Sequence, residues 1–317
     1  MISSKLKKIG LLKKISLMLF RIAILGGLSF ILLYPIIFMI SFAIRSPLDL
    51  ENPMVVWIPQ NFTWDNLYRA AGYLNYSSTV ASTFRVGFVS SVIQIVSCAL
   101  VGYGMARFEY RLKKFVMAAV LITILVPPQI IIAPTYLYYS FFDFFGAGKL
   151  IGLITGSNIS ISLVNNPALF YILAGFGIGI RSGLFIFIFM QFFKGMPKEL
   201  EEAAYVDGSG VIRTFLRIMI PNAIPAIVTV FLFSVVFYWN DYFYSAMYIP
   251  KHPTISVALV SMTQSLYGSM YNGGITKLEL STILQAGSLL AVLPPLFIYM
   301  FFQRYFTESI ERTGIVG

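Results

Sequence analysis

The sequence predicts an all-α integral membrane protein that crosses the membrane six times, with both termini in the cytoplasm. The 317-residue chain is 58% apolar and only 11% charged, and its mean hydropathy is +0.80. A soluble monomer of this composition would expose large apolar patches. The apolar residues gather in six runs that are long enough to cross a bilayer, and most basic residues lie between alternate runs.

Each of the six runs exceeds the length of about 20 residues that a membrane helix needs. We expect spans at about 22–43, 84–106, 115–138, 170–193, 223–248 and 283–306. The third run contains VPPQ at 126–129, and we expect this proline pair to kink the helix. The kink is either structural alone or a bend that serves alternating access.

The distribution of Lys and Arg predicts the orientation of the spans. With the N-terminus inside, the inner segments hold 16 of the 23 basic residues and the outer segments hold six, while Arg181 falls inside the fourth run. The basic segment 1–21 is predicted to lie along the inner membrane surface. The transmembrane domain is then 22–306, and a short cytoplasmic tail follows at 307–317.

The sequence offers little for metal, redox or nucleic-acid chemistry. Cys98 is the single cysteine and His252 the single histidine, so neither an internal disulfide nor a transition-metal site is expected. The net charge of +10 is spread between apolar runs, which favours a membrane orientation signal over a nucleic-acid surface. We expect no catalytic residues and no metal ligands in this chain.

A polar loop at 194–222, on the predicted inner side, interrupts the apolar pattern. Its first half, MPKELEEAAYV, is typical of a short helix with Pro197 in the first turn. Glu199, Glu201 and Glu202 lie where the helix dipole favours negative charge. Although such a loop is usually a solvated connection, its amphipathic pattern favours a helix presented to a partner.

Turn-forming residues divide this loop into two helices. Gly208 suits the left-handed position that follows a helix end. Ser209 is predicted to cap the second helix, GVIRTFLRIMI, and Pro221 is predicted to stop it. The sequence therefore predicts a folded helix–turn–helix loop.

The same loop follows a long spaced pattern, formed by Glu202, Ala203, Ala204, Gly208, Ile218 and Pro221. It resembles the cytoplasmic signature of bacterial ABC-importer permeases, with Ile220 where the signature prefers leucine. The stretches YPIIFMISFAIRS, VGYGMARFEYRLKK and FYWNDYFYSAMYI are similar to the carbohydrate-uptake branch. The resemblance extends over 22–317 and is nearest to second permease subunits of the maltose-transporter type.

The resemblance implies a multi-pass subunit of an importer in the bacterial cytoplasmic membrane. Its implied partners are a second, homologous permease subunit, a cytoplasmic ATPase dimer, an extracellular solute-binding protein and an oligosaccharide. ATP and Mg would be bound by the ATPase, and this chain has no Gly-x-x-x-x-Gly-Lys-Ser/Thr loop of its own. The positions implied in ATPase coupling are Glu202, Ala203, Ala204, Asp207, Gly208 and Pro221.

The resemblance implies a sugar substrate, and the outer half of the fifth run offers suitable side chains. They are Tyr238, Trp239, Asn240, Asp241 and Tyr242, which combine aromatic faces with hydrogen-bonding groups. The alternative is that this stretch is a structural hinge, with Asn240 bonded to a neighbouring helix.

Arg181 lies about 20 Å from the inner boundary marked by Lys194, at 1.5 Å per helical residue. A membrane-buried arginine is costly unless it is paired or faces water. Three interpretations stay open: the fourth helix begins at Arg181, Arg181 pairs with an acid such as Asp241, or Arg181 lines the pathway. The third would favour an acidic sugar, because a guanidinium binds carboxylates in a two-pronged manner.

Two other function classes fit the sequence less well. A self-contained secondary transporter or channel would normally need more spans or inverted repeats with buried carboxylates, and the runs contain almost no acidic residue. A membrane enzyme would need a His, Asp or Glu cluster, which the sequence lacks. Purification under gentle conditions discriminates among them, since only the importer subunit requires an ATPase and a second permease.

Overall fold

The computed structural model describes residues 2–144, 146–155 and 160–314, which are mainly helical. Within these residues the only extended pairings are two isolated bridges, Arg45 with Phe62 and Phe142 with Ile161. The helices, in order, are α1 Ile2–Ala43, α2 Pro47–Glu51, α3 Asp65–Leu74, α4 Tyr76–Arg107, α5 Lys113–Leu125, α6 Pro128–Ser140, α7 Ala147–Thr155, α8 Ala168–Gly175, α9 Ser182–Gly195, α10 Glu199–Val206, α11 Val211–Thr214, the π-helix η1 Phe215–Met219, α12 Ile220–Asn222, α13 Ile224–Trp239, α14 Phe243–Tyr248, α15 Ile255–Tyr271 and α16 Lys277–Gly314.

The chain divides into two compact units. Unit 1 comprises Met1–Gly72 and Thr263–Leu290, and unit 2 comprises Tyr73–Met262 and Ala291–Gly317. In unit 1, the buried Asn66 donates to the backbone oxygen of Arg45 at 2.8 Å and accepts a hydrogen bond from Thr282. These bonds tie α3 to the end of α1 and to the first turns of α16.

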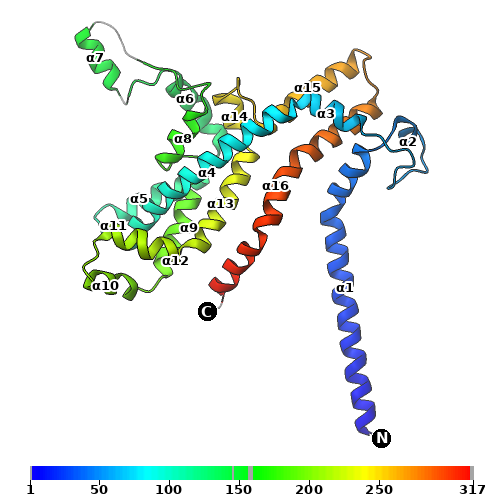
Figure 1. Ribbon diagram of the computed structural model, residues 1–317, viewed down its shortest axis with the longest axis horizontal. Coiled ribbons are helices and arrows are strands. Elements are labelled where there is room, and N and C mark those ends of the chain that lie inside the picture. Colours follow the sequence, from blue (N-terminus) through cyan, green and yellow to red (C-terminus); the bar gives the residue numbers. More distant parts are fainter. Residues whose placement is uncertain (1, 145, 156–159, 315–317) are drawn as a thin grey trace. The chain divides into compact units, whose positions relative to one another are not determined.

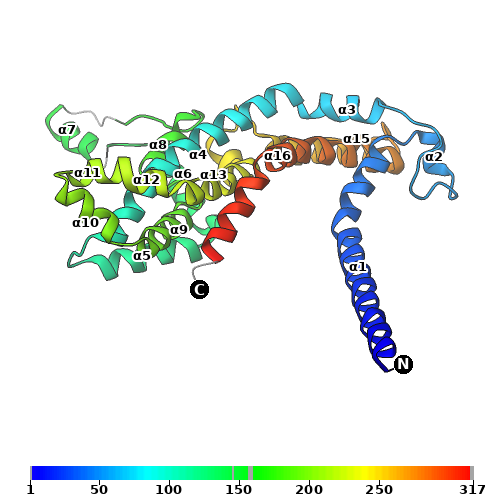
Figure 2. The ribbon, with the colours of Figure 1, turned by 60° about the horizontal axis from the view of Figure 1, so that its bottom comes forward.

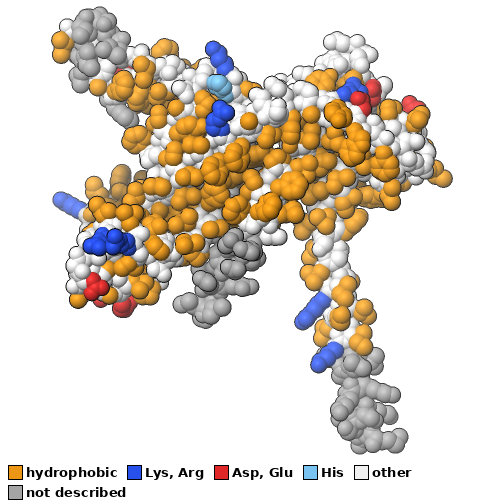
Figure 3. Space-filling model, viewed as in Figure 1, with side chains coloured by type: hydrophobic (Ala, Val, Ile, Leu, Met, Phe, Trp, Pro, Cys, Tyr) orange, Lys and Arg blue, Asp and Glu red, His pale blue; other side chains and the backbone are white. Residues whose placement is uncertain are grey.

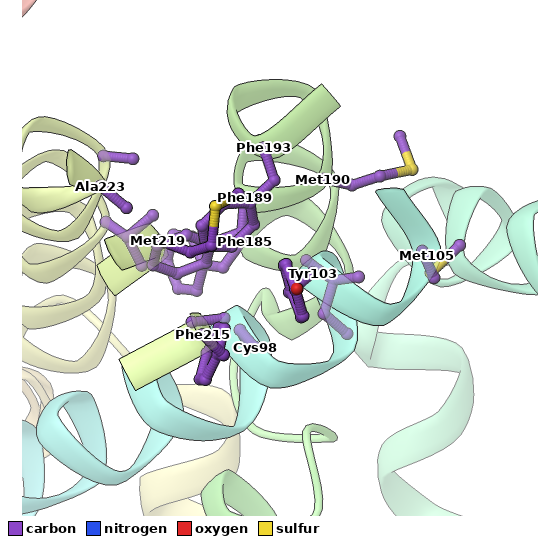
Figure 4. Packing of buried hydrophobic residues seen from close by; sticks show 14 residues of the cluster. Cys98, Tyr103, Met105, Phe185, Phe189, Met190, Phe193, Phe215, Met219 and Ala223 are labelled. Carbon is purple, nitrogen blue, oxygen red and sulfur yellow. The ribbon is translucent and has the colours of Figure 1, made fainter. Parts of the chain in front are cut away.

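The core of unit 2 forms where α4 packs against α9, α8 and α13 (Figure 1). Figure 4 shows the buried side chains of α4, α9 and η1 converging on one apolar cluster. Phe185, Phe189 and Phe193 follow one face of α9 at helical spacing, and all three are fully buried. Gly102 lets α4 approach this face closely, because a Cβ at position 102 would lie 2.6 Å from that of Phe189.

A network of hydrogen bonds inside the apolar core joins α4, α13 and the segment at the start of α9. Gln94 of α4 is fully buried and donates to the Ile180 backbone oxygen at 2.8 Å and to the Ser182 hydroxyl at 2.7 Å. Ser234 of α13 donates to the Gln94 side-chain oxygen at 3.0 Å. Since unpaired buried amides are costly, this network fixes how α4, the start of α9 and α13 meet.

Three helices of the described chain are long and apolar enough to cross a membrane: Lys14–Ala43, Tyr76–Arg107 and Lys277–Gln303. The number rises to five if two bent pairs each count as one span. These pairs are α5 with α6, bent by 104°, and Val211–Asn222 with α13, bent by 75°. The apolar helix α9 has only 14 residues. The structure thus supports three to five candidate spans, and six spans and their orientation stay predictions.

The predicted kink at VPPQ is confirmed as a full break. The helix α5 ends at Leu125, and α6 begins at Pro128, where the missing N–H of a proline costs no helical hydrogen bond. The prediction of a continuous fourth span at 170–193 is wrong. The glycine-rich stretch between α8 and α9 forms a turn instead, with left-handed backbone at Gly177 and Arg181.

The fifth predicted span, 223–248, is also interrupted. The helix α13 ends at Trp239, and the separate short helix α14 begins at Phe243. Towards the N-terminus, α1 continues as one helix from Ile2 through the predicted interfacial segment. The last residues of the predicted tail, 315–317, lie outside the described residues, and the membrane placement of segments 1–21 and 307–317 stays a prediction.

Candidate functional site

The polar loop folds as the sequence predicts, with one change at its second cap. The helix α10 ends in a Schellman turn, in which the Ser209 N–H donates to the Ala204 oxygen and the Gly208 N–H to that of Tyr205. Gly208 takes the left-handed conformation, with φ of 77°. The prediction that Ser209 caps the next helix is wrong, because Gly210 occupies the N-cap of α11 without a side-chain bond.

Pro221 does not end the second helix of the loop. A π-helical turn precedes it, in which the Ile220 N–H bonds to the Phe215 oxygen, and the helix continues to Asn222. The chain then bends by 75° into α13. Because proline has no N–H, the wider π turn accommodates it without a lost backbone bond at that position.

The solvent-facing sides of α10 and α11 carry exposed apolar side chains. Val206 is 88% exposed and Ile212 is 75% exposed, while Ala203 and Glu202 are also exposed. Figures 1 and 2 show these two helices together at one end of unit 2, and Figure 3 shows acidic and basic side chains gathered in the same region. The loop therefore presents a folded surface of mixed apolar and charged character.

Two neighbouring members of the spaced pattern point in different directions. Ala204 is buried against unit 2, whereas Ala203, Asp207 and Gly208 are exposed. Among the described residues, a basic neighbour holds the carboxylate of Glu201 and not that of Glu202. Its oxygen Oε2 lies 2.6 Å from Nε of Arg107, and the Tyr103 hydroxyl donates to its other oxygen at 2.5 Å.

Sequence reasoning missed this buried ion pair. The three glutamates of the first turn look equivalent by composition, and Arg107 looks like one of several positive-inside residues. The available signal was helical spacing: Glu201 and Ala204 are three residues apart, so they share the face of α10 that packs inward.

Two cavities lie in unit 2 where α9 begins. The larger, of about 430 Å³, brings together Arg181, Asn240, Asp241 and Tyr242 with the proline pair of the α5–α6 break. The smaller, of about 300 Å³, is lined by Arg181, by Tyr238 of the predicted sugar-contact group, and by three tyrosines that sequence reasoning did not select: Tyr139, Tyr244 and Tyr248. Arg181 and Tyr244 line both cavities.

Arg181 has a strained backbone at this junction. Its φ of 59° is left-handed, a conformation that costs a residue with a side chain about 1–2 kcal/mol. It is the N-cap residue of α9, which agrees with the interpretation that the fourth helix begins there. Its side chain is exposed, with the guanidinium carbon 5.7 Å from the centroid of the Phe237 ring.

The structure does not contain the ion pair between Arg181 and Asp241. Asp241 instead accepts hydrogen bonds from the Ser245 backbone at 2.7 Å and hydroxyl at 2.8 Å, so it caps α14. No other ion pair of Arg181 occurs in the described part of the chain. The guanidinium is thus available to a ligand in either cavity.

Of the other predicted pathway residues, Asn240 and Tyr242 line the larger cavity and Trp239 does not. Trp239 lines neither cavity: it is buried, and its ring N–H donates to the Ala291 oxygen of α16 at 3.0 Å. Asn240 donates to the Val236 oxygen of its own helix at 3.0 Å, and the bond to a neighbouring helix that the hinge alternative required does not occur among the described residues. Tyr242 is exposed on the wall of the larger cavity.

A family comparison identifies the chain. Residues 99–312, about two thirds of the sequence, match the family described as binding-protein-dependent transport system inner membrane component. The chain belongs to this family. Together with the relatives described next, this match confirms the resemblance to permease subunits of carbohydrate-uptake ABC importers.

Relatives of this inner membrane component are similar along nearly their whole length. The arabinooligosaccharides transport system permease protein AraQ of Halalkalibacterium halodurans is 24% identical, over 92% of this chain and 93% of that one. The melibiose/raffinose/stachyose import permease protein MelC of Bacillus subtilis is 25% identical, over 82% and 84%. A crystal structure of a bacterial ABC transporter for import of the acidic polysaccharide alginate shares the fold, with a TM-score of 0.65 and 19% identity over 91% of this chain and 95% of that one.

Proposed function

We propose that this inner membrane component translocates an oligosaccharide across the bacterial cytoplasmic membrane as one permease subunit of an ABC importer. A separate ATPase would drive transport, and an extracellular solute-binding protein would deliver the substrate. The observation that carries the proposal is the folded α10–α11 surface, whose apolar side chains and Gly208 turn fit a docking contact with a cytoplasmic partner.

The coupling contact is assigned to the exposed members of the spaced pattern. Glu202, Ala203, Asp207 and Gly208 face outward, so they are available to the ATPase, while the small side chain at Ala203 permits close approach. Ala204 and Pro221 have supporting roles, the first in packing and the second in the bend before α13.

An acidic oligosaccharide is the substrate class that we favour. Arg181 exposes a guanidinium between two cavities, and tyrosines line the smaller of them. Tyrosine rings suit the faces of sugars, and a guanidinium can hold a carboxylate in a two-pronged manner. The alginate importer with the same fold provides a precedent for acidic saccharides, while AraQ and MelC are named for neutral ones.

The proposal is tested by purification of the complex under gentle conditions. We expect a cytoplasmic ATPase and a second permease to co-purify with this chain, and a co-encoded binding protein to retain an oligosaccharide. A chain that transports in proteoliposomes without any ATPase would contradict the proposal. A peptide or an inorganic ion in the binding protein would contradict the sugar assignment.

A further inference from the structure

A buried charge cluster joins the loop helix α10 to the membrane helix α4. Arg107 and Glu201 form its ion pair, and their side chains are each only 8% exposed. A second nitrogen of the Arg107 guanidinium donates to the Met196 backbone oxygen at 2.9 Å. One guanidinium thus contacts both α10 and the residue that ends α9.

The aromatic ring of Tyr103 completes this cluster. Tyr103 and Arg107 are four residues apart on α4, so both face Glu201. The ring lies 5.5 Å from that of Phe193 in α9 and 4.8 Å from that of Phe215 in η1 (Figure 4). The ion pair beside this ring is itself buried, and a buried charge pair is screened little by solvent.

Besides the cluster, α10 is held in place by its packing against α11, by the buried side chain of Ala204 and by two short linkers. The linker from α9 contains only residues 196–198, and the linker to α11 contains only residues 207–210. Such linkers can bend when a partner displaces α10. The buried pair opposes that bending, because separating its charges would leave each one unpaired in an apolar environment.

The same helix α4 makes another polar contact at Gln94, beside Arg181. Gln94 and Arg107 are 13 residues apart, so they are separated by about 20 Å along a continuous helix. Gln94 binds the Ile180 oxygen and the Ser182 hydroxyl, the two neighbours of Arg181. The helix α4 therefore connects the ion pair at Arg107 to the segment that lines both cavities.

We propose that the Tyr103–Arg107–Glu201 cluster is the contact through which motion of α10 is transmitted to α4 and to the cavity at Arg181. These are positioning residues, and they act through α10 and not on the substrate. The inference rests on the proposed function, since it assumes that an ATPase moves α10. It assigns this transmission to Glu201, which lies next to the exposed Glu202 of the spaced pattern but faces the opposite way.

The test uses the assembled importer and follows the cavity without its substrate. A cysteine is introduced by Ile178→Cys, because Ile178 lines the smaller cavity and is exposed. Its reaction rate with N-ethylmaleimide is measured with and without ATP, Mg and orthovanadate, which together trap a closed ATPase. The unaltered chain reports any background from the native Cys98, which is fully buried.

In the Ile178→Cys chain we expect ATP–vanadate to change the labelling rate. Adding Glu201→Gln or Arg107→Lys should bring the ratio of the two rates to about one, which is the value without coupling. Vanadate trapping itself should persist. Glu199→Gln is the matched control, since it removes an exposed carboxylate from the same helix and should leave the ratio unchanged.

A milder variant covers the case in which a broken ion pair prevents assembly. Tyr103→Phe keeps the ring and removes only the hydroxyl, and we expect it to reduce the vanadate response. A full response in assembled Glu201→Gln, Arg107→Lys and Tyr103→Phe complexes, even with lowered thermal stability, would overturn the inference and leave a purely structural role. Absence of any ATPase from the unaltered complex would instead overturn the proposed function.

Discussion

Replacing Gly208 tests whether the turn after α10 must be left-handed. A Cβ at Gly208 meets no atom within 4 Å, so a substitution there causes no steric clash, and the strain comes from its φ of 77°. A left-handed conformation costs an L-residue about 1–2 kcal/mol, and a β-branched residue is more severely restricted. The native turn should therefore be disfavoured about 5–30-fold in Gly208→Ala, and further in Gly208→Val.

Gly210 provides the control for this experiment. A Cβ there also meets nothing within 4 Å, but its φ is −77°, which any residue adopts. We expect ATPase association and coupled transport to fall in Gly208→Ala and more in Gly208→Val, with membrane insertion unchanged and Gly210→Ala near the unaltered level. Equal effects of the alanine substitutions at Gly208 and Gly210, or full substrate-stimulated ATP hydrolysis in Gly208→Val, would refute the reasoning.

Three further predictions concern the cavity, the core and the loop between α2 and α3. Arg181→Lys keeps a positive charge but loses the two-pronged contact, so uptake of an oligouronate should fall about tenfold or more while basal ATP hydrolysis persists. Unchanged uptake in both Arg181→Lys and Arg181→Gln would show that Arg181 does not line the substrate pathway. Gly102→Ala should destabilise the complex by about 1–3 kcal/mol in thermal unfolding, because its Cβ would clash with Phe189. The Cβ of Gly104→Ala meets no close neighbour, so this variant should lose less stability. Similar losses of stability in the two variants would contradict the packing of α4 on α9. Burial opposes the charged form of Asp49, but N–H donors of Asn61 and Gln60 outweigh this effect and lower the pKa of Asp49. Its stabilisation of the loop between α2 and α3 is therefore present above the ordinary carboxyl pKa of about 3.9 and is lost as pH falls through the lower folded value. Amide exchange at these donors, corrected for intrinsic rates, should rise on acidification, and an identical pH dependence in Asp49→Asn would contradict this.

The sequence predicts those parts of the structure that depend on local chemistry. Apolar runs mark the long helices, because a bilayer needs about 20 apolar residues to cross it. The proline pair predicts the α5–α6 break, and Gly208 predicts the turn after α10, since each restricts or permits backbone angles that few other residues share.

Other features depend on neighbours that are distant in sequence. Nothing local distinguishes Glu201 from Glu202, and only the packing of α10 on α4 buries the first and exposes the second. The sequence predicts both Trp239 and Tyr242 as sugar-contact residues. In the structure Trp239 at the end of α13 bonds to α16, and Tyr242 lies on a cavity wall. The glycine-rich stretch before Arg181 was compatible with either a helix or a turn.

The central claim is that α10 docks on a separate ATPase, and a crosslink from Ala203 tests it most directly. Ala203 is exposed on α10, so Ala203→Cys should tolerate a short thiol-reactive photocrosslinker in intact membranes. We predict that the crosslinked product contains the cytoplasmic ATPase, and that its yield changes when ATP and orthovanadate are added. An Ala203→Cys chain that crosslinks only to lipid or to membrane subunits, in a complex that still transports, would contradict the account.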